Sequence, residues 1–337
     1  MPAPDPRANP ILLGHDAAEA TILDAIQAGR MHHAWLIQGP EGVGKATLAY
    51  RFARRLLAGQ GGRTLDLPET DPVFRRVAAA SHADMLTVER EYDTKRRRMR
   101  SQIAVDDVRK INGFMSLTAA EGGWRVVVVD GAEDMNPASA NAILKVLEEP
   151  PPRAVLILVC SAPGRLLPTI RSRCRRLRLS ALDDATMHTL LRRYLPDLAD
   201  DQRERLVAMS EGSPGRALAM AEDEGLAIAM VVDNVLSSLP DIPVSKQYDI
   251  ADQLVRVETG FATFMDMLRT GVAAAVRAVA RGQGDPDQER MVALRPIEAW
   301  TEVWHALTRL QDDTEHANLD KRQAIVAGLG LLTGQAT

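Results

Sequence analysis

The residues whose types and spacing point most clearly to chemistry are Gly39, Gly42, Gly44 and Lys45, in the segment GPEGVGK. Glycines at this spacing let the backbone wrap a phosphate group with its N–H groups pointing inward, and the lysine reaches the outer phosphates of a nucleotide. An apolar run precedes the segment and helical spacing follows it, so the loop leads into the N-terminus of a helix, which favours an anion. A glycine-rich turn that carries a lysine by coincidence is the alternative, and the strand–loop–helix context argues against it.

The position after the lysine lacks the group that holds magnesium in such loops. A Ser or Thr hydroxyl is needed there, and the residue is Ala46. Thr47 comes one residue late, about 100° further around a helix and away from the site. The sequence therefore predicts a loop that still cradles phosphate but whose magnesium-dependent chemistry is damaged.

A second acidic position shows a matching defect. Asp130 ends a run of valines, where an acid usually helps to hold magnesium. ATPases of this architecture place a Glu directly after that Asp to activate water, and here the residue is Gly131. Glu133 and Asp134 follow on a turn that we expect to lead away from the site. We predict a nucleotide-binding fold with little or no turnover, which binds ATP weakly or not at all and holds no metal.

Strands and helices alternate up to about residue 179, and this pattern predicts an α/β domain with a parallel sheet. Four consecutive valines, Val126 to Val129, indicate a strand buried on both faces. Asn136 and Pro137 suit the start of a helix. We expect strands at 34–37, 84–89, 126–130, 154–159 and 175–179, and helices at 15–28, from the loop to 57, at 103–117 and at 137–149.

The chain beyond Ser180 contains no convincing strand pattern. Three short helices are expected first, at 182–195, 201–209 and 214–221, followed by longer helical patterns. We therefore expect three domains: a nucleotide-binding-like domain at 1–179, a small helical domain at 180–224 and an all-α domain at 225–337.

The composition excludes several classes of protein. The 337 residues carry a formal net charge of −4, which argues against a broad DNA-binding face. Aromatic residues make up only 4%, too few for a platform that stacks single-stranded nucleic acid. The basic run Lys95–Arg100 is either a local DNA contact or, as the simpler reading, a solvated hairpin tip.

The two cysteines, Cys160 and Cys174, cannot form a four-thiolate zinc site, and we expect reduced structural thiols. No apolar run approaches the ~20 residues needed to cross a bilayer. The first residues lack the apolar core of a signal peptide. These features predict a cytoplasmic protein.

Two further segments carry a family resemblance. Residues 141–151 read NAILKVLEEPP and residues 169–174 read TIRSRC, with Gly14-His15 upstream and GSPGRA at 212–217 downstream. On these motifs the chain resembles the clamp-loader AAA+ family, and within it the delta-prime subunits of bacterial DNA polymerase III. The resemblance implies an AAA+ module, a small helical lid and a helical collar that holds a ring of subunits together.

The resemblance also implies roles for individual residues. In this family the Ser-Arg-Cys triplet supplies an arginine finger, which maps onto Arg173 and reaches the ATP of a neighbouring subunit, because a guanidinium is always charged and matches phosphate geometry. A solvated basic edge is the alternative for Arg173 and the arginines around it. Arg216 matches a second-sensor position, with surface charge equally possible, and Ser161 ends a strand where a first sensor sits.

The partners implied are the gamma/tau-type motor subunits, the delta subunit, the sliding clamp and primer-template DNA, all within a DNA-directed DNA polymerase holoenzyme. Many delta-prime subunits carry a four-cysteine zinc module after the phosphate-loop helix, whereas here the segment is free of cysteine, so we predict no zinc. The chain is thus expected to be a scaffold subunit without its own hydrolysis. An active AAA+ ATPase, either the motor subunit or a related helicase, is the alternative, and Ala46 and Gly131 argue against it.

Overall fold

The computed structural model describes residues 4–59, 62–93, 98–100, 102–222, 224–317 and 319–334. The chain divides into two compact units, Met1–Leu218 and Ala219–Thr337. The first unit holds a β-sheet together with α7, α8 and most of α9, which span Asp184–Tyr194, Asp200–Ser210 and Pro214–Ala221. The expected three-domain division, with boundaries at 179 and 224, stays a prediction.

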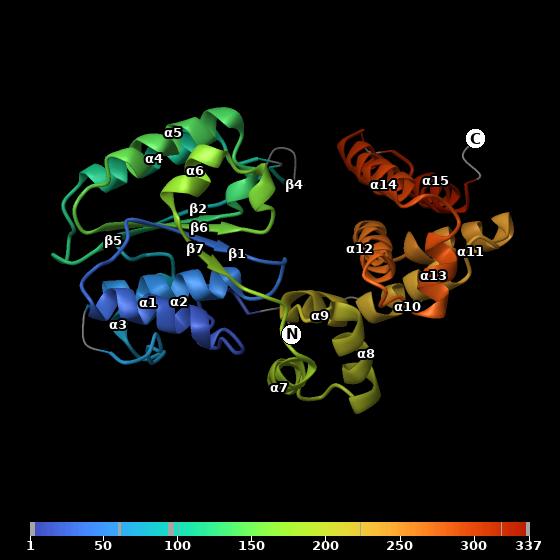
Figure 1. Ribbon diagram of the computed structural model, residues 1–337, viewed down its shortest axis with the longest axis horizontal. Coiled ribbons are helices and arrows are strands. Elements are labelled where there is room, and N and C mark those ends of the chain that lie inside the picture. Colours follow the sequence, from blue (N-terminus) through green and yellow to red (C-terminus); the bar gives the residue numbers. More distant parts are fainter. Residues whose placement is uncertain are drawn as a thin grey trace. The chain divides into compact units, whose positions relative to one another are not determined.

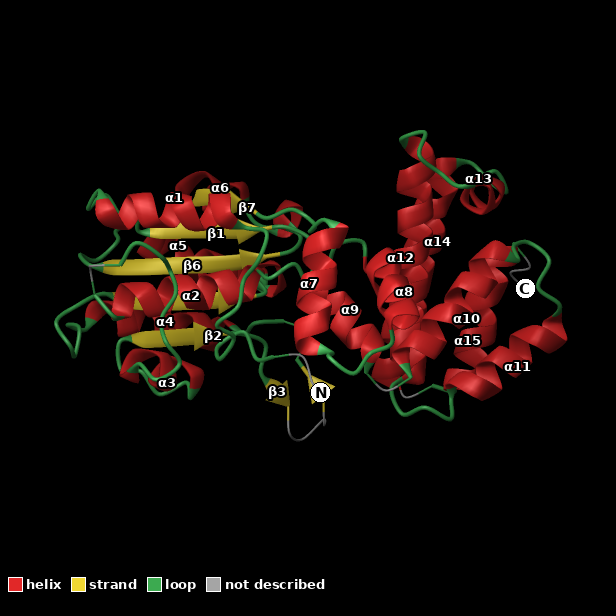
Figure 2. Cartoon of the chain, turned by 90° about the horizontal axis from the view of Figure 1, so that it is seen from below, coloured by secondary structure: helices red, strands yellow, loops and turns green. Residues whose placement is uncertain are grey.

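The first unit is built on a parallel sheet whose strand order is β2-β5-β6-β1-β7. Figure 2 shows β7, β1, β6 and β2 lying in this sequence across the sheet. The strands are β1 Ala34–Gln38, β2 Met85–Val88, β5 Arg125–Asp130, β6 Ala154–Cys160 and β7 Arg175–Arg178. The expected α/β class with a parallel sheet is confirmed, and each expected strand is present.

Helices cover both faces of this sheet (Figure 1). On one side lie α1 Asp16–Gln27, α2 Lys45–Leu57 and α3 Pro72–Ala78, and on the other α4 Val105–Ser116, α5 Pro137–Glu148 and α6 Pro168–Arg173. Successive side chains of a strand point to opposite faces, so Trp35 and Ile37 join one core while Leu36 joins the other. The valine strand behaves in the same way and is buried on both faces, as predicted.

Local signals explain where the helices begin. The Asn136 side chain accepts a hydrogen bond from the backbone N–H of Ser139 at 2.9 Å, and Pro137 occupies the first turn of α5. Asp71 caps α3 in the same manner, accepting from the N–H of Val73 at 2.7 Å. The α5 cap was expected from the sequence, whereas α3 is not among the helices expected from it.

One further helix was not anticipated. The helix α6 carries Arg173 at its last residue. A short antiparallel pair, β3 Tyr92–Asp93 and β4 Arg98–Met99, connects β2 to α4. Residues 95–97 of the basic run lie outside the described residues, so both interpretations of the run stay predictions.

The second unit is helical throughout its described residues. Its helices are α10 Gly225–Ser237, α11 Val244–Leu254, α12 Gly260–Ala280, α13 Pro286–Val292, α14 Ile297–Ala317 and α15 Lys321–Thr333. A core that includes Phe264, Leu268 and Trp300 holds them together. The expected all-α C-terminal region is confirmed. In the parts of the chain described here, no helix is both long and apolar enough to span a bilayer.

Candidate functional site

The glycine loop lies between β1 and α2, as predicted, and each glycine has a steric reason to be there. Gly42 and Gly44 have φ values of 74° and 104°, a region that only glycine adopts without strain. A Cβ atom at Gly44 would lie 2.8 Å from Cδ1 of Leu12. A Cβ atom at Gly39 would lie 2.4 Å from the carbonyl oxygen of Leu179. The close packing leaves room for backbone alone, which is the shape a phosphate cradle requires.

Lys45 begins α2 and is 6% exposed. Its Nζ donates to the carbonyl oxygen of Pro40 at 2.5 Å, so the ammonium group folds back onto its own loop. Burial lowers the pKa of Lys45, and the carboxylates of Glu133, Glu41 and Asp130 oppose that shift. The lysine is therefore held by backbone and by nearby negative charge.

The residues around the expected magnesium position do not fit a metal. Ala46 packs against the apolar core beside α2, and Thr47 is buried at the next position. The position directly after β5, where hydrolysis would need a carboxylate, is Gly131, which has no side chain and adopts a φ of 74°. Burial raises the pKa of Asp130, the charge of Glu89 adds to the shift, and Lys45 opposes it. Asp130 thus stands at the position of the usual acidic residue, without a hydroxyl at position 46 or a carboxylate at position 131.

Glu133 lies in the site although the sequence analysis placed it on a turn leading away. It belongs to a 3₁₀ turn, Ala132–Asp134, and its Oε1 accepts a hydrogen bond from the N–H of Ser161 at 2.7 Å. Burial, followed by the Glu133 carboxylate, raises the pKa of Cys160 to about 12. Oε2 of Glu133 is buried and has no hydrogen-bond partner in the described part of the chain. The expectation failed because β5 and β6 are parallel neighbours, so residues following the two strands meet at one edge of the sheet.

The loop also contacts the start of α9. The backbone N–H of Gly215 donates to the carbonyl oxygen of Gly42 at 2.9 Å, and Oγ of Ser213 donates to the carbonyl oxygen of Glu41 at 2.8 Å. A Cβ atom at Gly42 would lie 2.3 Å from that Oγ. Backbone and hydroxyl groups of the GSPGRA segment therefore close over the glycine loop.

Arg216 follows this contact directly, and its Nη1 lies 3.2 Å from Oε2 of Glu211. Ser161 contributes its backbone N–H to Glu133, as described above. The structure thus brings both residues to the neighbourhood of the loop. Their sensor roles stay predictions.

Arg173 lies at the end of α6, and its side chain contacts Thr169 and Glu148, away from the loop. Its Nη1 donates to the carbonyl oxygen of Thr169 at 3.1 Å, and its Nη2 lies 2.9 Å from Oε1 of Glu148. The side chain is 37% exposed. The guanidinium group is therefore accessible at the surface of its own chain, as an arginine that acts on another molecule must be.

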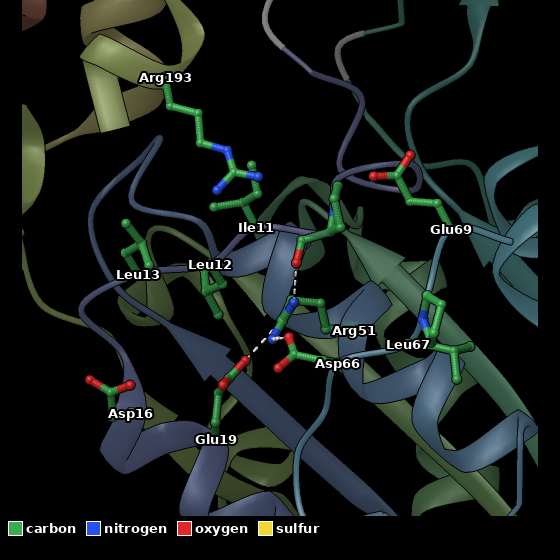
Figure 3. Close-up of a pocket in the computed structure, with 12 residues that line it drawn as sticks. Ile11, Leu12, Leu13, Asp16, Glu19, Arg51, Asp66, Leu67, Glu69 and Arg193 are labelled. Atoms are coloured by element: carbon green, nitrogen blue, oxygen red, sulfur yellow. Dashed lines mark hydrogen bonds and ion pairs between the residues drawn. The ribbon is translucent and has the colours of Figure 1, made fainter. Parts of the chain in front are cut away.

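A separate cavity of about 470 Å³ opens beside α1 and α2 (Figure 3). Arg51 lies within its lining, where Nε donates to Oε1 of Glu19 at 2.8 Å and Nη2 donates to Oδ1 of Asp66 at 2.6 Å. Nη1 of Arg51 also donates to the carbonyl oxygen of Pro10. Because the N–H groups of Arg51 are directed to these partners, the arginine ties the N-terminal segment, α1 and the loop after α2 together.

In this chain a glycine loop joins the first strand of a parallel α/β fold to a helix. That arrangement is the fold of the P-loop nucleotide-binding proteins. A family model described as "DNA polymerase III, delta subunit" matches residues 14–183. The chain belongs to this family.

Curated relatives include bacterial subunits of two kinds. DNA polymerase III subunit delta' of Pseudomonas aeruginosa is 40% identical over 182 residues, which cover 54% of this chain and 53% of the relative. Subunit delta' of Escherichia coli is 34% identical over 205 residues, which cover 60% and 58%. Subunit gamma/tau of Mycobacterium tuberculosis is 31% identical over 219 residues, which cover 64% and 36%. The chain therefore spans little more than half the length of the delta' relatives that it matches.

Proposed function

We propose that this chain is a delta-prime-type subunit of a bacterial clamp loader, working in the cytoplasm. In this proposal it completes a ring with gamma/tau-type motor subunits and a delta subunit. The assembled ring then loads a sliding clamp onto primer-template DNA during replication. The observation that carries the proposal is a glycine loop with its lysine in place beside Ala46 and Gly131, which remove the magnesium-binding hydroxyl and the water-activating carboxylate.

The chain's own pocket contributes little chemistry in this proposal. Gly39, Gly42 and Gly44 would receive the phosphates of ATP, and Lys45 would neutralise their charge. Bound ATP would supply a γ-phosphate for transfer to water, yet no residue at positions 46 or 131 assists that step. Asp130 and Glu133 place negative charge close to Lys45, which disfavours a further anion. ATP therefore binds weakly here or not at all.

Arg173 supplies the chemistry that reaches another subunit. A guanidinium group presents five N–H donors in a planar fork and stays charged at all physiological pH values. In a neighbouring motor subunit it would stabilise charge on the transferring phosphoryl group. Its surface position at the end of α6 supports this role.

The test has two parts. The purified chain should co-purify with the motor subunits and should show no magnesium-dependent ATP hydrolysis by itself. In the reconstituted loader, Arg173→Ala should leave assembly intact and lower turnover at the affected site by ~10³-fold, the scale typical of arginine fingers. Arg178→Ala removes a nearby exposed arginine and serves as the matched control.

Robust hydrolysis by the isolated chain would instead support the alternative, an active AAA+ ATPase. Unchanged turnover in the Arg173→Ala loader would refute the role of Arg173 in trans while leaving membership of the complex open to the co-purification result.

A further inference from the structure

A single carboxylate contacts the arginines at the α6–β7 edge. We define the arginine edge as Arg171, Arg173, Arg175, Arg176 and Arg178. Among the described residues, only Arg173 of this set has a carboxylate oxygen within 4 Å, and that carboxylate is Glu148. Arg171 and Arg176 donate to carbonyl oxygens, and Arg175 lies over the ring of Trp35.

Both terminal nitrogens of the Arg173 guanidinium group have partners, and the Glu148 carboxylate is one of them. Nη2 of Arg173 lies 2.9 Å from Oε1 of Glu148, and Nη1 donates to the carbonyl oxygen of Thr169 at 3.1 Å. A phosphate bound end-on by an arginine uses the same two nitrogens. The carboxylate therefore occupies part of the fork that a phosphate in a neighbouring subunit would need.

Helix stability does not explain why Glu148 is at this position. Glu148 is the last residue of α5, and a negative charge there is opposed by the helix dipole. The lysine one turn earlier, Lys145, forms no ion pair within 4 Å with Glu148 or Glu149 in the described structure. The interaction that does hold Glu148 is the one with Arg173.

We propose that Glu148 holds the Arg173 guanidinium group on its own chain and competes for it with the triphosphate of the neighbouring subunit. This inference rests on the proposed role of Arg173 in trans. Glu148 then weakens retention of ATP at that neighbouring site, because each engagement of the finger must displace a carboxylate. Its negative charge also faces the approaching phosphates.

The pair is open to solvent, with Arg173 37% and Glu148 51% exposed, so its effect is modest. Ion pairs of this kind change an equilibrium by roughly two- to fivefold. Glu148→Gln keeps the shape of the side chain and removes its charge. It should lower the KM for ATP of the loader by roughly two- to fivefold and leave kcat within about twofold, because the competition is relieved equally in the ground state and the transition state.

The experiment uses the full chain reconstituted with the motor and delta subunits, and ATP turnover is measured with clamp and primed DNA. Four variants are compared with the natural chain: Glu148→Gln, Glu149→Gln, Arg173→Ala and the double variant Glu148→Gln with Arg173→Ala. Glu149 is exposed and adjacent, so its substitution removes the same charge without touching Arg173. Size-exclusion chromatography confirms that each variant assembles.

The expected result is a lower KM for Glu148→Gln alone, no change for Glu149→Gln, and no effect of Glu148→Gln once Arg173 is alanine. A raised KM or a reduced kcat for Glu148→Gln would overturn the inference, because Glu148 would then orient the finger rather than compete for it. Equal behaviour of the two glutamine variants would also overturn it. If Arg173→Ala leaves turnover unchanged, the proposed role of Arg173 fails first, and this outcome is distinct from a failure confined to Glu148.

Discussion

The contact between the glycine loop and α9 predicts that Gly42→Ala destabilises the first unit more than strain alone would. An alanine at φ 74° costs about 1–2 kcal/mol, because the left-handed region is crowded by Cβ. Loss of flexibility in the unfolded chain offsets about 0.4–1 kcal/mol of this. The new Cβ would also lie 2.3 Å from Oγ of Ser213, so the hydroxyl must move and lose its bond to the Glu41 carbonyl oxygen.

The lost hydrogen bond adds about 1 kcal/mol. The free energy of unfolding should therefore fall by about 2 kcal/mol in Gly42→Ala. The chain offers a matched control in Gly29, whose φ is 62° and which has nothing within 4 Å of a Cβ position. Gly29→Ala carries the backbone strain without the collision and should lower the free energy by about 1 kcal/mol or less.

Hydrogen exchange of backbone amides in β1 and β6 measures the free energy of opening of the unit that contains the loop. Ser213→Ala removes the hydroxyl group, which donates to the Glu41 carbonyl oxygen and accepts from the N–H of Arg216. This variant should account for most of the difference between the two glycine variants. If Gly42→Ala is no more destabilising than Gly29→Ala, the contact between the loop and α9 contributes nothing and the reasoning fails.

Two further predictions concern buried ionisable groups. Burial raises the pKa of Asp130, so this carboxyl group binds a proton more readily in the folded chain than in the unfolded chain. The stability that the protonated group contributes is therefore present at acid pH and is lost as the pH rises through the pKa of the folded state. Asp130→Asn should therefore stabilise the chain at pH 7, and the gain should shrink in acid; urea unfolding at several pH values checks this, and a constant gain would contradict it. Burial raises the pKa of Cys160 and of Cys174 to about 12, so both thiols should react with iodoacetamide at pH 8 roughly tenfold or more slowly in the native chain than in the unfolded one. Mass spectrometry follows the alkylation, and equal rates in the two states would show that the thiols are accessible.

Much of the sheet could be predicted because its strands are short apolar runs bounded by breakers. The valine strand is buried on both faces, and a run of consecutive apolar residues predicts such burial. The start of α5 could also be predicted, because Asn136 and Pro137 stabilise it through residues next to them in sequence. By contrast, α6 spans six residues and starts at a proline, so it is too short to show a helical period.

The site was less predictable where it depends on pairs distant in sequence. The inward turn of Glu133 follows from the adjacency of β5 and β6, and a reading of strand order could have found it. The contact between Gly42 and Gly215 joins residues 173 positions apart, and no local pattern signals it. Lys145 and Glu149 lie one helical turn apart but form no ion pair within 4 Å among the described residues, whereas Glu148 pairs with Arg173 of α6.

The geometry of the loop gives its three glycines a structural reason that does not depend on ATP hydrolysis. Gly39 is fixed by the Leu179 carbonyl group, Gly42 by Ser213 and Gly44 by Leu12. Each would collide with its neighbour if it carried a Cβ, whether or not a nucleotide is bound. Removal of the magnesium-binding hydroxyl at position 46 disturbs none of these contacts, because Ala46 packs into the core beside α2. The glycines and a hydroxyl at position 46 are thus under separate physical constraints. The glycine loop alone is therefore evidence for the fold and not for ATP hydrolysis.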